Sequence, residues 1–154
     1  MKGEPIEILF VEDDLAHVEI VQRSFDTCRV ANRLTHVADG QAALDYLRQE
    51  GDWRDPARSP RPGAVLLDLR LPKVDGLDVL KSIKTDPKLS SIPVVILTTS
   101  NTERDIAKAY ECHANSYLVK PMDFMQFTRL MDTLVYYWLA WNRRPNGTTP
   151  PGPK

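Results

Sequence analysis

Five polar side chains stand at or just after the ends of short apolar runs, where buried strands are expected to end. Glu12 and Asp13 follow the first run, and Asp68, Thr98 and Lys120 end or follow three later ones. Carboxylates gathered at strand ends need a cation, and oxygen ligands without nearby Cys or His favour Mg²⁺. A hydroxyl and an ammonium beside them could donate hydrogen bonds to a phosphoryl group. The set predicts a Mg²⁺ site in which one carboxylate attacks phosphorus.

Each of these groups has a simpler explanation when it is considered alone. A polar residue after a strand can be a solvated loop end or a helix cap. Asp14, for example, suits the N-cap of a helix that begins at Leu15. The groups occupy the ends of four different apolar runs, however, and caps explain such a set poorly. We therefore treat them as one candidate site.

Alternating strand and helix patterns must position these groups. Expected strands cover residues 6–11, 34–38, 64–67, 94–97 and 116–119, and expected helices cover 15–28, the segments that follow Gly40 and Gly76, 102–112 and 124–142. Strands that alternate with helices predict an α/β fold with a parallel sheet and helices on both faces. In such sheets the site lies at the carboxyl ends of the strands, which is where the polar residues cluster.

Length and composition narrow the class of protein. The chain has 154 residues, enough for one domain, and 20 basic against 21 acidic residues leave a net charge of −1. We therefore expect no nucleic-acid partner. No apolar run approaches the roughly 18 residues of a membrane span, and the first residues lack a signal peptide, so we expect no membrane partner and a cytoplasmic location. Cys28 and Cys112 have no disulfide or metal spacing.

Prolines mark two additions to this core. Seven of the 12 prolines fall in residues 51–63 and in the last ten residues. Proline removes backbone donors and blocks regular structure, so we expect a surface loop at 51–63 and a disordered tail at 145–154.

Four sequence runs resemble the receiver domains of two-component response regulators: FVEDD, LLDLRLPKVDG, VVILTTS and SYLVKP. They occur in the family's order, and the resemblance covers residues 6 to about 142. It implies a flavodoxin-like, doubly wound (βα)5 sheet with strand order 2-1-3-4-5. The receiver domain would span residues 1–144, including the extended loop at 51–63 and the long helix at 124–142.

The resemblance also implies roles for the acidic residues. Asp68 resembles the aspartate that accepts phosphate from a sensor histidine kinase and also contacts the metal. Asp13 would bind Mg²⁺ directly and Glu12 through water, and the backbone carbonyl of Arg70 would be a further ligand. Gly76 matches a glycine that allows a tight approach to the next helix.

The remaining motif residues resemble the switch of the family. Thr98 would hydrogen-bond the attached phosphoryl group and Lys120 would pair with it. The Lys120-Pro121 bond is expected to be cis. Tyr117 resembles the aromatic residue that turns inward on activation, reshaping the face formed by helix 4, strand 5 and helix 5. Ser100, like Arg70, is a candidate for tuning the lifetime of the phosphoryl group.

The chain departs from a minimal receiver in two places. Asp13 and Asp68 are 55 residues apart because of the loop at 51–63, and the last helix holds six of the 12 aromatic residues. A core stripe is expected at Phe127, Leu130, Leu134, Trp138 and Trp141. Apolar surface would then remain at Val135, Tyr136, Tyr137 and Leu139, where it could form a homodimer interface. A thicker core under a longer helix is the alternative.

These two departures resemble the stand-alone receivers of phytochrome-type histidine kinases, which implies a light-responsive kinase as phosphodonor. Two other functions stay open. A receiver-fold adaptor could act without phosphate, although such proteins usually lack an acidic residue or the lysine. A Mg²⁺-dependent aspartyl-phosphate hydrolase needs a second acid two residues after its nucleophile, where this chain has Arg70. We expect a signalling switch rather than an enzyme.

Overall fold

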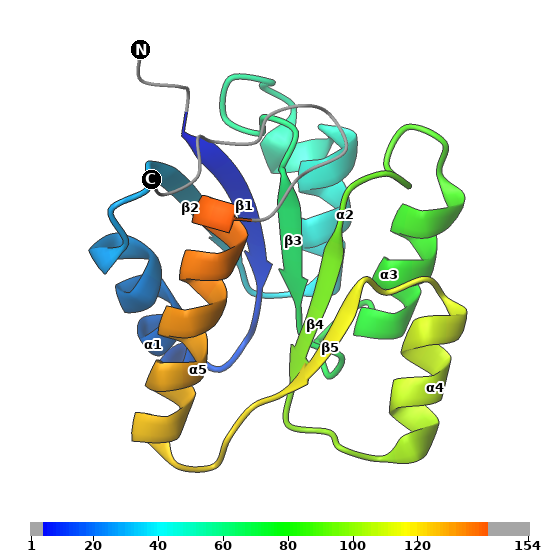
Figure 1. The fold of residues 1–154 in the computed structure, drawn as a ribbon. Helices are drawn as coiled ribbons and strands as arrows, with labels where there is room; N and C mark the ends of the chain where they lie inside the picture. The colour runs from blue at the N-terminus through cyan, green and yellow to red at the C-terminus, as the bar shows by residue number, and fades with distance from the viewer. Residues whose placement is uncertain (1–4, 142–154) are drawn as a thin grey trace.

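A parallel sheet of five strands forms the centre of the structure (Figure 1). The computed structural model of the chain describes residues 5–141. The strand order is β2-β1-β3-β4-β5, which confirms the expected topology. The strands are β1 (Ile6–Val11), β2 (Asn32–Val37), β3 (Ala64–Leu67), β4 (Val94–Thr98) and β5 (Ser116–Val119). Because all neighbouring pairs are parallel, the carboxyl ends of the strands share one edge of the sheet.

Five α-helices cover the two faces of this sheet. They are α1 (Leu15–Thr27), α2 (Gly40–Arg48), α3 (Gly76–Thr85), α4 (Glu103–Glu111) and α5 (Phe124–Tyr136). In Figure 1, α1 and α5 lie on one face, and α2, α3 and α4 lie on the other. The side chains of Asp14, Asp39, Thr102 and Asp123 accept hydrogen bonds from backbone N–H groups in the first turns of α1, α2, α4 and α5. Such caps fix where each helix begins.

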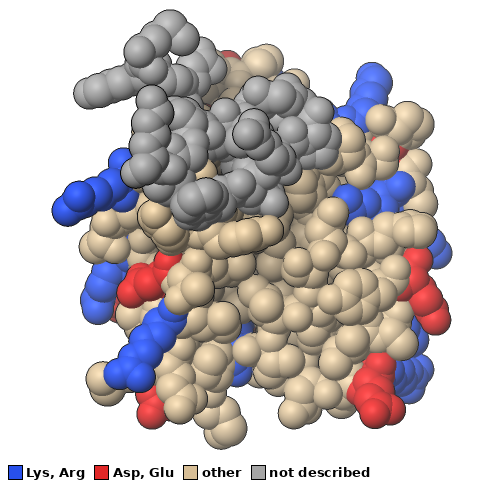
Figure 2. Space-filling view, viewed as in Figure 1, with Lys and Arg blue, Asp and Glu red and all other residues tan. Residues whose placement is uncertain are grey.

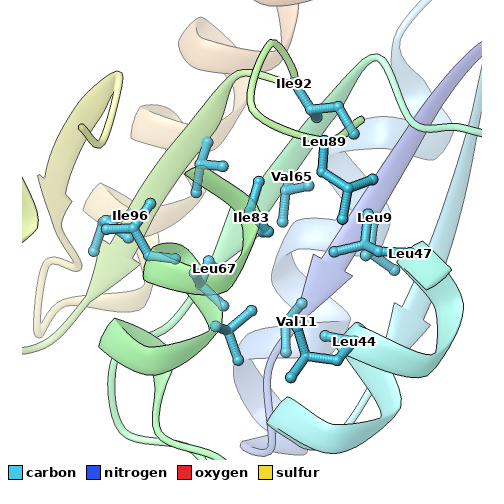
Figure 3. Close-up of a cluster of buried hydrophobic side chains, with 14 of the residues drawn as sticks. Leu9, Val11, Leu44, Leu47, Val65, Leu67, Ile83, Leu89, Ile92 and Ile96 are labelled. Carbon is cyan, nitrogen blue, oxygen red and sulfur yellow. The ribbon is translucent and has the colours of Figure 1, made fainter. Parts of the chain in front are cut away.

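Alternation along the central strands divides the core into two layers. In β1, Leu9 and Val11 pack toward α2, α3 and α4, whereas Ile8 and Phe10 pack toward α1 and α5. Figure 3 shows the first layer, with the side chains of β1, β3 and β4 meeting those of α2 and α3. Strands buried on both faces need continuous apolar runs, which is why these segments contain few polar residues before their ends.

The last helix differs from the expected one in its register. The side chains that enter the core are Phe127, Met131, Val135 and Leu139, all at most 1% exposed, whereas the expected positions 130, 134 and 138 are only half-buried. The apolar residues here come in adjacent pairs, so their pattern fits two helix faces about 100° apart equally well. The interface candidates Val135 and Leu139 are therefore wrong, because both belong to the core.

The other two interface candidates are exposed, and the helix ends in an irregular turn. Tyr136 is 48% exposed and Tyr137 is 54% exposed. After Tyr136 the α-helix gives way to a π-helical turn, η2 (Tyr137–Trp141). The expected disordered tail at 145–154 lies outside the described residues.

The proline-rich loop at 51–63 is packed against α2. It begins with a 3₁₀ turn, η1 (Gly51–Trp53). The Trp53 ring packs edge-on against the Tyr46 ring, with 5.1 Å between the ring centroids. The buried Tyr46 hydroxyl donates to the Pro60 carbonyl at 2.9 Å, and Ser59, within the loop, is also buried. The loop therefore extends the core at α2, while most of its residues remain exposed as expected.

Two further findings concern the described residues as a whole. They contain no cis peptide bond, so the expectation of a cis Lys120-Pro121 bond is wrong. None of the helices in residues 5–141 has the length and apolar character needed to cross a membrane.

Candidate active site

Three carboxylates meet at the carboxyl edge of the sheet. Glu12 and Asp13 follow β1 and Asp68 follows β3, and these two strands are direct neighbours. One oxygen from each carboxylate lies within 4.8 Å of the others. Glu12 and Asp68 are buried, whereas Asp13 is exposed, so the cluster opens to solvent on one side. An all-oxygen set with this spacing fits a hard divalent cation.

Lys120 supplies the positive charge of the cluster. Its Nζ donates to a Glu12 carboxylate oxygen and, at 3.1 Å, to Asp68 Oδ2, and the lysine side chain is 1% exposed. Burial raises the pKa of Glu12 to about 7; the hydrogen bond from Lys120 opposes this rise, and the charge of Asp68 adds to it. The buried carboxylates of Glu12 and Asp68 therefore share the single positive charge of Lys120. A bound metal or an added phosphoryl group would change this balance of charge.

Thr98 ends β4 beside the carboxylates. It is fully buried, its Oγ1 accepts a hydrogen bond from the Ser100 N–H at 3.4 Å, and its carbonyl accepts one from the Lys120 N–H at 2.7 Å. The hydroxyl keeps its own proton to donate. The structure thus brings together, at one edge of the sheet, the five residues that the sequence singles out.

A polar network connects the two loops of the site to α4. The Arg70 guanidinium and the Ser100 hydroxyl both donate to Asp105 Oδ2 at 2.5 Å, and the Tyr117 hydroxyl donates to the Ser100 carbonyl at 2.8 Å. The hydrogen bond from Ser100, helped by the charge of Arg70, lowers the pKa of Asp105. Tyr117 is half-buried, and burial raises the pKa of its phenol. In this structure Tyr117 is therefore bonded to the β4–α4 loop.

Gly76 holds the loop after Asp68 close to α3. A Cβ atom built on Gly76 would lie 2.2 Å from the Asp68 carbonyl oxygen and 2.5 Å from Leu69 Cα. The Gly76 N–H donates to the Leu69 carbonyl at 2.8 Å. Only glycine permits this approach of backbone to backbone, as the resemblance to receiver domains implies.

Two residues of the site neighbourhood are missing from the sequence prediction. Asp105 lies on the first turn of α4 and joins Arg70 to Ser100. His17 lies on the first turn of α1, with Nδ1 3.0 Å from Lys120 Nζ. Burial lowers the pKa of His17, and the Lys120 charge lowers it further. Their positions in the sequence could have indicated them, because each residue lies on the first turn of a helix that follows a loop of the site.

Comparison with known proteins identifies the family. The family model for the response regulator receiver domain matches residues 8–132. The chain belongs to this family. The receiver is 48% identical over 143 residues to the probable methanogenesis regulatory protein FilR2 of Methanothrix harundinacea, covering 92% of this chain and 89% of FilR2. It is 42% identical over 135 residues to response regulator Rcp1 of Synechocystis, covering 88% of this chain and 90% of Rcp1.

Solved structures share the receiver's fold. The crystal structure of the Mn²⁺-bound form of Rcp1 has a TM-score of 0.87 at 40% identity, covering 92% of this chain and 99% of that one. The crystal structure of the phosphorylated cyanobacterial phytochrome response regulator RcpA has a TM-score of 0.86 at 39% identity, with the same coverage. The resemblance stated from the sequence motifs is therefore confirmed, down to relatives in phytochrome signalling. The receiver belongs to a family of signalling domains.

Proposed function

We propose that this receiver accepts a phosphoryl group on Asp68 from a sensor histidine kinase. The observation that carries the proposal is the Asp68 carboxylate held beside Glu12, Asp13 and Lys120 at one strand edge. In the transfer, an Asp68 oxygen bonds to phosphorus while the bond from phosphorus to the donor nitrogen of the kinase breaks. The leaving imidazole keeps the electron pair. Lys120, now beside a phosphoryl group of nearly two negative charges, donates to the new oxygens, as does the Thr98 hydroxyl.

A Mg²⁺ ion fits the carboxylates of the receiver. The oxygen-only donor set and its 4.8 Å span suit a hard cation, and the related Rcp1 structure is a Mn²⁺-bound form. Glu12, Asp13 and Asp68, with the backbone carbonyl of Arg70, would hold the ion. When bound, it would neutralise charge on the transferring oxygens.

The kinase that supplies the phosphoryl group would be of the phytochrome type, in the cytoplasm. RcpA is a phytochrome response regulator, and the long aromatic C-terminal helix and the 51–63 loop of this chain support the same pathway. FilR2, at 48% identity, supports a different kinase as phosphodonor, because its name assigns it to the regulation of methanogenesis. In both pathways the phosphoryl group would be transferred to Asp68, and only the donor kinase would differ.

The output surface would be the face of α4, β5 and α5. Tyr117 and Thr98 would switch its conformation, and the activated receiver would form a homodimer through this face. Figure 2 shows this face as broadly uncharged, with Lys, Arg, Asp and Glu gathered mostly at its margins. Tyr110, Val119 and Tyr136 are exposed on these elements, and Tyr137 is exposed in the η2 turn that follows α5. Sedimentation velocity with and without beryllofluoride, a phosphoryl mimic, measures whether activation drives dimerisation.

Labelling with a small phosphodonor tests the proposal. The protein is incubated with Mg²⁺ and acetyl phosphate, and a base-labile phosphate on the chain is measured. We expect Asp68→Asn to abolish the label and Asp78→Asn, an exposed aspartate on α3, to keep it. A label that persists in Asp68→Asn contradicts the assignment of the phosphoacceptor. An unlabelled wild type favours the phosphate-independent adaptor, and steady release of phosphate without a lasting label favours the hydrolase.

A further inference from the structure

The Lys120 ammonium has three acceptors for its three N–H groups. Glu12 and Asp68 are carboxylates, and the third acceptor is Nδ1 of His17 at 3.0 Å. An ammonium carries only donors, so Nδ1 must present its lone pair and the imidazole proton must reside on Nε2. The lysine is therefore held on one side by charge and on the other by a neutral ring.

The position of the His17 ring is fixed by two helices. The Asp14 side chain accepts the His17 N–H at 3.3 Å and so sets the first turn of α1. From α5, the Phe127 ring packs against the imidazole at a centroid distance of 5.4 Å, and the His17 side chain is only 17% exposed. Asp14 Oδ2 lies 3.6 Å from Nδ1, farther than Lys120 Nζ. These contacts from α1 and α5 hold the imidazole in one position beside Lys120.

We infer that His17 is a positioning residue for phosphoryl transfer: its Nδ1 holds the Lys120 ammonium beside Asp68 without adding negative charge. The inference rests on the proposed transfer to Asp68. A third carboxylate in this position would compete with the incoming phosphoryl group for the lysine. A neutral acceptor keeps one N–H fixed while the N–H now bonded to Asp68 moves to the new oxygens. Without His17, one N–H of a buried ammonium loses its partner, and the lysine gains freedom to turn away.

Paired substitutions separate this role from packing. His17→Asn places a side-chain oxygen near the position of Nδ1 but loses the contact with Phe127, whereas His17→Leu keeps apolar packing and has no acceptor. With acetyl phosphate and Mg²⁺, we expect His17→Leu to slow Asp68 labelling about tenfold, as for loss of one hydrogen bond to a charged group. We expect His17→Asn to stay within about twofold of wild type. His113→Asn, at an exposed turn with φ of 69°, is the matched control and should leave the rate unchanged.

The outcomes are distinct. Equal labelling of both His17 variants, or a slower rate for His17→Asn than for His17→Leu, overturns the positioning role while leaving Asp68 as the acceptor. Absence of label in the wild type refutes the proposed function itself. A readout without metal or donor comes from ¹⁵N NMR of the imidazoles, with the His17 signal assigned from its loss in His17→Asn. We expect Nδ1 to be unprotonated at neutral pH, and a proton on Nδ1 overturns the inference because Lys120 could not donate to it.

Discussion

Replacing Asp105 by asparagine measures how strongly the network of Arg70, Ser100 and Asp105 binds α4 to the site loops. The change keeps the shape of the side chain and removes its charge. Arg70 is 59% exposed, so solvent screens its pair with Asp105, and we assign that pair about 0.5–1 kcal/mol. The Ser100 hydrogen bond falls from a charge-assisted bond to a neutral one, a loss of about 1 kcal/mol. Asp105→Asn should therefore lower the free energy of unfolding by about 1.5–2 kcal/mol, and the Tm by roughly 3–8 °C.

Urea unfolding of four proteins tests this estimate: wild type, Asp105→Asn, Arg70→Gln and the double variant, all with EDTA at neutral pH. The double-mutant cycle isolates the ion pair, for which we expect a coupling free energy of about 0.5–1 kcal/mol. The coupling should shrink in 1 M salt, because exposed charges are screened over a few ångströms there. Additive effects, with a coupling below about 0.3 kcal/mol, would refute the reasoning and reduce the network to unconnected contacts.

Two further substitutions test other parts of the fold. Gly76→Ala should cost about 3 kcal/mol or more in urea unfolding, because its methyl group would meet the Asp68 carbonyl oxygen at 2.2 Å; an unchanged midpoint contradicts the close approach. Lys84 donates from Nζ to the Ser90 and Ile92 carbonyls and to Asn115 Oδ1, and burial lowers its pKa. Lys84→Met keeps the apolar stem and should destabilise the fold by about 1–3 kcal/mol, whereas a stability equal to wild type would show that water replaces the ammonium.

The fold and the main site were predictable because both depend on local pattern. Apolar runs such as residues 64–67 read as strands buried on both faces, and the residue after each run is placed by topology. Asp68 and Lys120 could therefore be brought together although 52 residues separate them. The close approach at Gly76 was implied by the resemblance to receiver domains, and the structure shows its cause in the short distances to Asp68 and Leu69.

The features that sequence reasoning missed depend on side-chain packing across elements. The register of α5 was ambiguous because Leu134 and Val135 are equally apolar, and only contact with the sheet selects Val135. His17 could not be assigned to the site from sequence because its partner, Lys120, lies 103 residues away. Asp105 lacked a motif, since its role comes from the meeting of two loops.

The contact of Lys120 with Glu12 spans 108 residues of sequence. At roughly 5–20 residues per second, a ribosome adds the lysine about 5–20 s after the glutamate. During that interval β1 and β3 can be complete while Glu12, Asp13 and Asp68 still lack their cationic side chain. An acidic cluster formed on the nascent receiver in that interval would lack the charge of Lys120 until β5 is synthesised. A chain truncated before Lys120 would never gain this counter-charge.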